Sequence, residues 1–80
     1  MGLAASEKEL AAKASRFLKA ELKRAGITYA ELAKRLEDHG LSGETEASVS
    51  SKLGRGTFAA TFWLASLAAL GLEAMRLEDL

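Results

Sequence analysis

Residues 28–56 read TYAELAKRLEDHGLSGETEASVSSKLGRG, and this stretch decides the fold. Its apolar spacing predicts one amphipathic helix over 29–39, opened by a Thr28–Glu31 capping box and ended by Gly40. A Leu-Ser-Gly-Glu turn at 41–44 leads into a second, shorter helix predicted over 46–53. The predicted buried positions of the two helices are Leu32, Ala33, Leu36, Val49 and Leu53.

The 46–53 helix carries too few apolar residues to form on propensity alone, so packing must hold it in place. Thr45 is expected to cap it, and its outward side is small and polar. Two helices joined by a turn form the unit that presents a helix to the major groove of DNA. The outward side of the 46–53 helix is therefore the first candidate for a DNA contact.

Two further helices flank this unit. One is predicted over 7–25, between a Ser6–Glu9 capping box and a stop at Gly26. The other is predicted over 58–70, capped by Thr57, stopped by Gly71 and apolar almost all round. The apolar stripe of the first helix is Leu10, Ala14, Phe17, Leu18 and Leu22.

The composition favours an all-helical chain. Good helix formers dominate, and the 80 residues include no Pro and no Cys. We expect an all-α fold of four or five compactly packed helices in one domain, 1–80, with its core over about 7–72. A short extended C-terminal tail is expected over 73–80, although an extended arm, a short strand and a last helical turn all fit its pattern.

The formal net charge is zero, but the charges are unevenly distributed. Residues 1–40 hold eight Lys and Arg against six Asp and Glu, whereas 73–80 hold Arg76 against three acids. DNA-binding domains are usually basic on at least one face, so a zero sum weighs against DNA binding. An acidic tail can nevertheless cancel the sum while leaving a positive face intact.

From Leu18 to Leu72 the order of motifs resembles the helix-turn-helix domains of the lambda repressor, Cro and XRE-like group. The matching segments are Leu18…Leu22…Ala25-Gly26-Ile27-Thr28, Glu31-Leu32-Ala33, Leu53-Gly54-Arg55-Gly56 and Leu67-Ala68-Ala69-Leu70-Gly71-Leu72. The chain looks closer still to a group of short, uncharacterised bacterial proteins built on the same plan. The runs shared with that group resemble 17–26 and 52–58.

The chain departs from the repressor pattern at the turn. The repressor pattern places the turn glycine four residues after the Leu-Ala pair, where this chain has Glu37, and the glycine here arrives only at Gly40. The first helix of the motif therefore gains almost one turn. The two helices are expected to cross at a different angle than in the repressors. This difference affects how the 46–53 helix would enter a DNA groove, but it does not affect the helical core.

The resemblance implies a small DNA-binding protein that acts as a dimeric transcription regulator. Base contacts are expected from the outward side of the 46–53 helix, and phosphate contacts from that helix, the start of the 29–39 helix and the Gly-Arg-Gly turn. The candidate base contacts are Glu46, Ser48, Ser50 and Ser51. The candidate phosphate contacts are Thr28, Tyr29, Lys52 and Arg55.

Each candidate has a plainer interpretation. Ser and Lys on an outward face can simply be solvated, Thr28 can be only a cap, and Tyr29 can pack on the first helix. Arg55 can be a solvated side chain between two turn glycines. The alternative function is a protein-interaction or homodimerisation module on a repressor-like core that does not bind DNA. In either case the surplus apolar surface predicts a homodimer interface at Phe62, Trp63, Met75 and Leu77.

The sequence does not suggest catalysis. The single His, His39, has no matching Cys or carboxylate cluster, and no nucleophile–base pair or phosphate-cradling loop can be assembled. We expect no enzyme activity, cofactor, metal or small-molecule substrate. The apolar run over 58–72 is too short to span a bilayer, and no secretory signal pattern is present. A cytoplasmic protein with double-stranded DNA as its partner is therefore expected.

Overall fold

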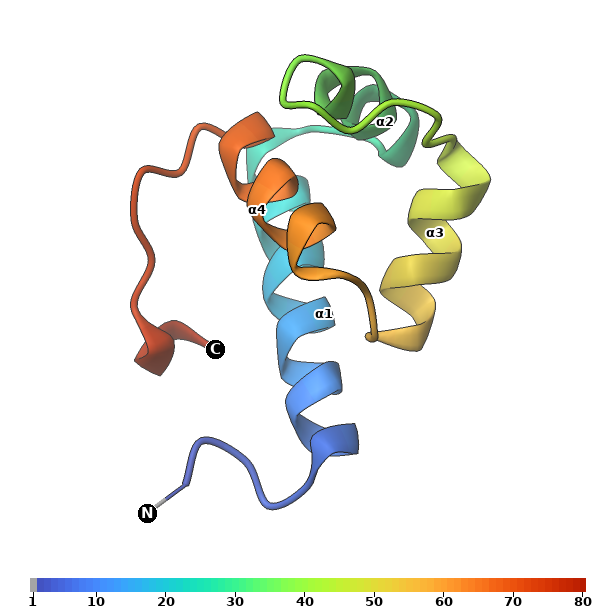
Figure 1. Cartoon of the computed structure of the whole chain (residues 1–80). Coiled ribbons are helices and arrows are strands. Elements are labelled where there is room, and N and C mark those ends of the chain that lie inside the picture. The colour runs from blue at the N-terminus through green and yellow to red at the C-terminus, as the bar shows by residue number, and fades with distance from the viewer. Residues whose placement is uncertain (1) are drawn as a thin grey trace.

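Four α-helices and one 3₁₀ turn form the structure, a computed structural model that describes residues 2–80 (Figure 1). The helices are α1 (Glu7–Ala25), α2 (Tyr29–Glu37), α3 (Glu46–Arg55) and α4 (Ala60–Ala69), followed by η1 (Leu77–Asp79). Within residues 2–80 there is no strand, so the all-α prediction is confirmed. No helix in this part of the chain combines the length and the apolar character needed to cross a membrane.

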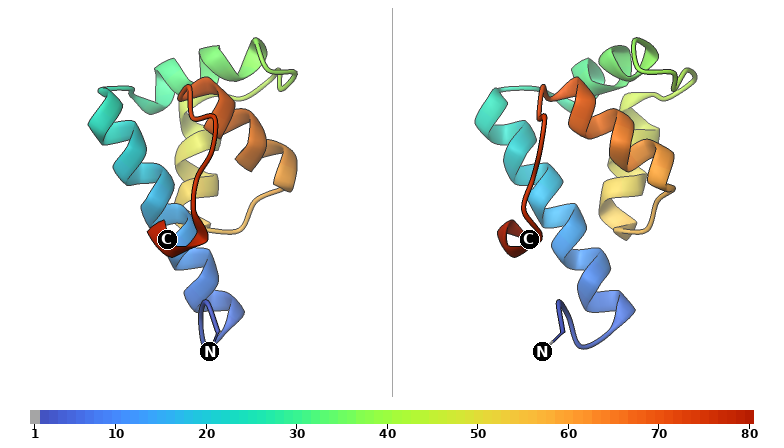
Figure 2. Two further views of the ribbon diagram at one scale, coloured as in Figure 1. Left: turned by 90° about the vertical axis from the view of Figure 1, so that its left-hand side faces the viewer. Right: turned by 60° about the vertical axis from the view of Figure 1, so that its left-hand side comes forward.

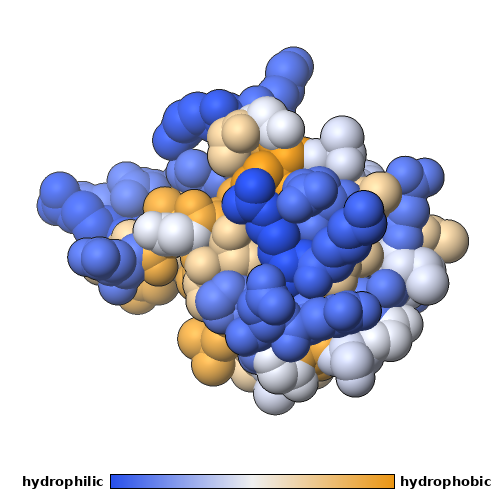
Figure 3. All heavy atoms as spheres, turned by 90° about the horizontal axis from the view of Figure 1, so that it is seen from above, coloured by the Kyte–Doolittle hydropathy of each residue, from blue (hydrophilic) through white to orange (hydrophobic). Residues whose placement is uncertain are grey.

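The long helix α1 is the axis on which the other elements are arranged. In Figure 1, α2 crosses near the C-terminal end of α1, and α3 then runs back toward the N-terminal half of α1. Helix α4 covers the remaining side of the core. Seen from above, over α2, mostly hydrophilic side chains cover this end of the molecule, with apolar residues in separate patches (Figure 3). That distribution fits an amphipathic α2.

The core is built from one apolar side of every helix. The predicted residues of the two central helices are all buried, as are Leu18 and Leu22 of α1. Ala14 and Phe17 of the same predicted stripe are half-buried. Leu10, near the start of α1, is 39% exposed because the helix extends past the elements that cover its C-terminal half. The most deeply buried apolar side chains are Leu18, Leu22, Leu32, Leu36, Val49, Leu53 and Phe62.

The capping boxes of α1 and α2 are only half formed. Ser6 Oγ accepts the Glu9 backbone N–H at 3.1 Å, but the Glu9 carboxylate accepts from the N–H of Ala5 and not from that of Ser6. Thr28 Oγ1 accepts the Glu31 N–H at 3.1 Å. The Glu31 side chain turns instead to Arg35, because an arginine one turn ahead offers a charged partner.

Helix α2 ends at Glu37, two residues before the predicted end. The chain continues through 38–40 as a tighter turn with bonds between residues three apart, and Gly40 then takes a φ of 87°. The N–H of Leu41 bonds back to Leu36 O at 3.0 Å, which is the bond that closes many helix C-termini. This ending places half-buried Leu41 against the core.

Both ends of the α3–α4 connection differ from the prediction. Helix α3 continues to Arg55 and stops at Gly56, not at Gly54. Helix α4 starts at Ala60, and Thr57 does not cap it. Phe58 lies outside the helix and stacks on Trp63, with the ring centroids 6.1 Å apart. This contact fixes the start of α4 by a hydrophobic staple, so no polar cap is needed.

The segment 72–80 returns along α1 and ends in η1 (Figure 2). The Asp79 carboxylate accepts the backbone N–H of Arg76 at 3.4 Å, which closes the turn. Of the three conformations considered for this tail, the structure shows an irregular chain with one 3₁₀ turn. This segment will be called the C-terminal segment.

Candidate nucleic-acid interface

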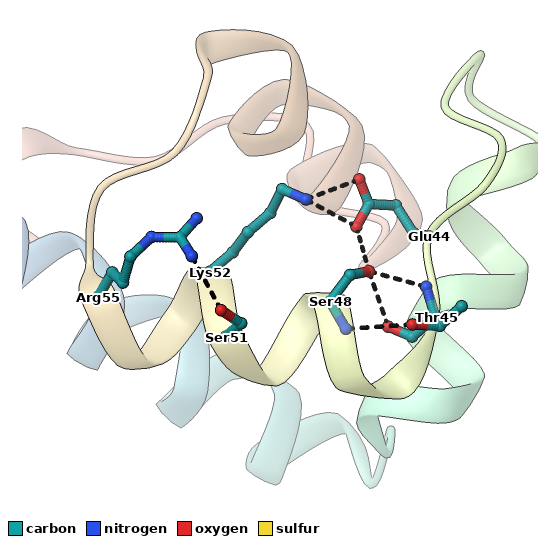
Figure 4. Close-up of polar contacts among 6 residues, drawn as sticks. All are labelled: Glu44, Thr45, Ser48, Ser51, Lys52 and Arg55. Atoms are coloured by element: carbon teal, nitrogen blue, oxygen red, sulfur yellow. Dashed lines mark hydrogen bonds and ion pairs between the residues drawn. The ribbon is translucent and has the colours of Figure 1, made fainter.

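The outward face of α3 consists of exposed Glu46, Ser50 and Ser51, as predicted. Ser48 and Lys52 of the same helix are half-buried, and both turn toward Glu44 in the preceding turn (Figure 4). The Ser48 hydroxyl donates to Glu44 Oε1 at 2.6 Å, and Lys52 Nζ lies 3.0 and 3.1 Å from the two carboxylate oxygens. The α3 face therefore offers fewer groups to a ligand than the sequence suggests.

The ammonium group of Lys52 lies between the Glu44 carboxylate and the aromatic ring of Phe62. Its Nζ lies 5.7 Å from the centroid of the Phe62 ring in α4, and its side chain is 26% exposed. Burial raises the pKa of the Glu44 carboxyl, but the hydrogen bonds from Ser48 and Lys52 and the Lys52 charge outweigh it and hold the pKa below 4.5. The Lys52 ammonium group is therefore paired with Glu44 in the folded chain, and its phosphate contact stays a prediction.

Ser48 is likewise engaged. Its backbone N–H donates to Thr45 Oγ1 at 3.1 Å, and its hydroxyl accepts the Thr45 N–H at 2.8 Å. This reciprocal pair is a complete capping box, and it confirms Thr45 as the cap of α3. Ser48 therefore takes part in starting the helix, and its base contact stays a prediction.

Arg55 is exposed at the C-terminal end of α3. One of its terminal nitrogens donates to Ser51 Oγ at 2.8 Å, and its guanidinium makes no ion pair within residues 2–80 (Figure 4). The charge of Arg55 is therefore uncompensated. It stands at one edge of a groove that the sequence pattern alone does not predict.

This groove runs between α1 and the C-terminal end of α3, and its lining contains five cations and no carboxylate. Four of the cations lie on α1 at positions that share one side of the helix, and their spread along the axis is roughly 22 Å at 1.5 Å per residue. The cations are Lys8, Arg16, Lys19, Lys23 and Arg55. We call this feature the basic groove.

The rest of the protein leaves few other cations free. Elsewhere, basic side chains pair with acidic neighbours: Arg24 with Glu21, Arg35 with Glu31, Lys52 with Glu44 and Arg76 with Glu78. Seven cations remain without an ion pair in the described chain, and five of them line the basic groove. A net charge of zero thus conceals a concentration of positive charge on one face.

Small residues fix the width of the basic groove. Gly56 has a φ of 75°, and a Cβ built there would lie 2.7 Å from the carbonyl oxygen of Ala11 in α1. Buried Ser15 donates its hydroxyl to the Leu53 carbonyl, one of the orphan acceptors at the end of α3. These two contacts hold the end of α3 against α1 and keep Arg55 beside the lysines.

The start of α2 does not line the basic groove. Thr28 is exposed and serves as the cap described above, and half-buried Tyr29 packs against the core. Tyr29 therefore takes the plainer of its two predicted roles.

The residues predicted for a dimer interface are divided between core and surface. Phe62 is 1% exposed and belongs to the core, so that prediction is wrong for the folded chain. Trp63 is half-buried between Phe17 and Phe58, and Met75 lies half-buried in a hollow beside α1. Leu77 is 67% exposed, and Leu64 of α4, which was not predicted, is 64% exposed.

No group of three or more His, Cys, Asp or Glu side chains within residues 2–80 is placed to hold a metal ion. His39 is exposed in the turn after α2.

Residues 2–75 match a sequence family described as a domain of unknown function, DUF6471. The chain belongs to the DUF6471 family. The matched range contains all four helices and every residue of the basic groove, so both features lie within this DUF6471 domain. No curated protein and no solved structure matches the chain.

Proposed function

We propose that this protein binds double-stranded DNA through the basic groove and acts as a transcription regulator. The observation that carries the proposal is the segregation of charge: five of seven unpaired cations line one groove that contains no acid. Lys and Arg side chains that neutralise phosphates supply most of the affinity of proteins for DNA, since they release condensed counterions.

The lining of the basic groove favours a duplex over a single strand. Proteins that bind single strands stack the bases on aromatic side chains, and no aromatic residue lines this groove. Apart from the cations, its lining consists mostly of small residues, and the cations suit contacts with a sugar–phosphate backbone. The cations of α1 spread over a length equal to about six to seven base-pair steps, at 3.4 Å per step.

In this proposal the exposed side of α3 makes the contacts that recognise the base sequence of the DNA. Ser50 and Ser51 can serve donors or acceptors on base edges, and Glu46 can accept from the amino group of cytosine. Ser48 and Lys52 are left out of this proposal because both bond to Glu44. With so few base contacts, phosphate contacts should dominate, and binding should depend more on salt than on sequence.

The test is fluorescence anisotropy with a labelled random duplex at low salt, comparing Lys19→Glu with Lys34→Glu. Both residues are exposed lysines without an ion pair, but only Lys19 lies in the basic groove. Lys19→Glu should weaken binding on the order of tenfold, because it replaces a phosphate contact by a repulsion. Lys34→Glu should change it by less than about threefold. Equal losses from both variants, or no binding by the folded wild type, would contradict the proposal.

A second copy of the chain completes the proposal, because regulators of this kind commonly place two recognition units on DNA. The exposed side of α4 is the proposed contact. Leu64 is its large exposed apolar residue, and the whole of α4 carries no charge. Sedimentation should show a dimer for the wild type and a folded monomer for Leu64→Lys. A wild type that stays monomeric at high concentration would refute this part.

The alternative function, an interaction module without DNA binding, is favoured by one observation. The Glu44–Lys52 pair removes the central cation of α3, which a DNA-reading helix would be expected to expose. The same anisotropy experiment separates the two functions. A dimer that depends on Leu64 but ignores DNA at low salt would select the interaction module.

A further inference from the structure

A second hollow lies between α1 and the C-terminal segment, and the proposed function does not use it. Its wall is apolar and combines Phe17 of α1 with Leu72, Met75 and Leu80 of the C-terminal segment. Lys13 and Arg16 of α1 stand in the same lining. Folding back the C-terminal segment over α1 thus creates a site with an apolar side and a cationic side.

Three cations and two acids line this hollow, so its acids do not neutralise all of its cations. Glu21 is committed to Arg24, with 3.0 Å between the paired atoms. The Asp79 carboxylate is turned to the backbone N–H of Arg76 in η1. Lys13 and Arg16 form no ion pair within residues 2–80. The negative charge of Asp79 offsets one of their two charges, so one net positive charge remains beside the apolar wall.

We propose that this hollow binds a small monoanion with an apolar body, of the chemical class of medium-chain carboxylates. The carboxylate contacts Arg16 and Lys13, because a guanidinium holds a carboxylate by two parallel hydrogen bonds. The aliphatic body lies on Phe17 and Met75 and removes their apolar surface from water. A highly charged ligand such as a polyphosphate would leave the apolar wall uncovered, which is why the two parts of the lining together select an amphipathic anion.

Arg16 connects this hollow to the basic groove, because its side chain lines both. An anion held by Arg16 takes that charge away from phosphate and should weaken duplex binding. This consequence rests on the proposed function, whereas the ligand site does not.

The test is a titration of the ¹⁵N-labelled full chain with octanoate, compared with octanol, which has the same body and no charge. Octanoate should shift the amide signals of Arg16, Phe17 and Met75 and bind about tenfold more tightly than octanol, the difference made by one charge-assisted contact. Because Phe17 packs on Trp63 with 5.9 Å between ring centroids, the fluorescence of Trp63 should respond as well.

The control variants are Arg16→Ala and Lys34→Ala, since both remove an exposed cation and only the first lies in the hollow. Arg16→Ala should abolish the preference for octanoate, and Lys34→Ala should retain it. Equal affinity for octanol and octanoate, or shifts confined to the surroundings of Leu64, would overturn the proposal. The octanoate and octanol titrations contain no DNA, so their outcome tests the ligand site independently of the proposed function. A duplex affinity unchanged by saturating octanoate would refute only the coupling through Arg16.

Discussion

Two glycines at the end of α3 should respond in opposite directions to the same substitution. Gly54 is helical, and a Cβ built there meets no atom within 4 Å. Gly54→Ala should therefore stabilise the protein by about 0.5–1 kcal/mol through helix propensity. Gly56 has a φ of 75°, which costs alanine about 1–2 kcal/mol, and its Cβ would lie 2.7 Å from the Ala11 carbonyl oxygen. Relieving that overlap adds about 1–3 kcal/mol.

The assay is thermal unfolding followed by circular dichroism on the two single variants and the wild type. In a domain of this size 1 kcal/mol shifts Tm by about 4–8 °C, so Gly54→Ala should raise Tm by a few degrees. Gly56→Ala should lower it by roughly 10 °C or more. A Gly56→Ala protein as stable as the wild type would show that the end of α3 does not approach α1 at Ala11. The geometry of the basic groove would then be wrong.

Three further substitutions test the buried polar groups. Glu44→Gln should cost about 1 kcal/mol at neutral pH, because it removes the charge partner of Lys52. The pKa of Glu44 is lower in the folded state than in the unfolded state. The stabilisation is therefore present above pH 4.5 and is lost as the pH falls through the pKa that Glu44 has in the folded protein. The Tm values of the variant and the wild type should converge in acid. Ser15→Ala should destabilise by about 1–3 kcal/mol, since the Leu53 carbonyl loses its donor. Ser66→Ala should stabilise by about 1 kcal/mol, since its fully buried hydroxyl has no hydrogen-bond partner, and urea unfolding checks both serines.

Local signals predicted the helices because they act over one turn of chain. Ser6 and Gly26 bound α1 at the predicted residues, and Thr45 caps α3. The prediction was wrong where a distant contact decides the boundary. Gly56, not Gly54, ends α3, because a residue without a side chain is needed beside Ala11. Phe58 stays outside α4 because its ring stacks on Trp63.

The candidate site could be predicted only in part. The polar face of α3 follows from its sequence, but the pairing of Lys52 with Glu44 depends on how the 41–44 turn folds back. The lysines of α1 are visible in the sequence as a set outside the apolar stripe. Only tertiary packing shows that they face Arg55 and lie apart from the acids, because 32 residues separate Lys23 from Arg55 along the chain.

The most direct measurement of the central claim is the dependence of duplex affinity on salt concentration. If all five cations of the basic groove contact phosphate, the plot of log K against log salt should have a slope of about −4.5. Affinity should then fall on the order of 500-fold between about 50 and 200 mM salt, and Lys19→Gln should reduce the steepness by about 0.9. A slope near zero, or one that Lys19→Gln leaves unchanged, would contradict the assignment of the basic groove to DNA.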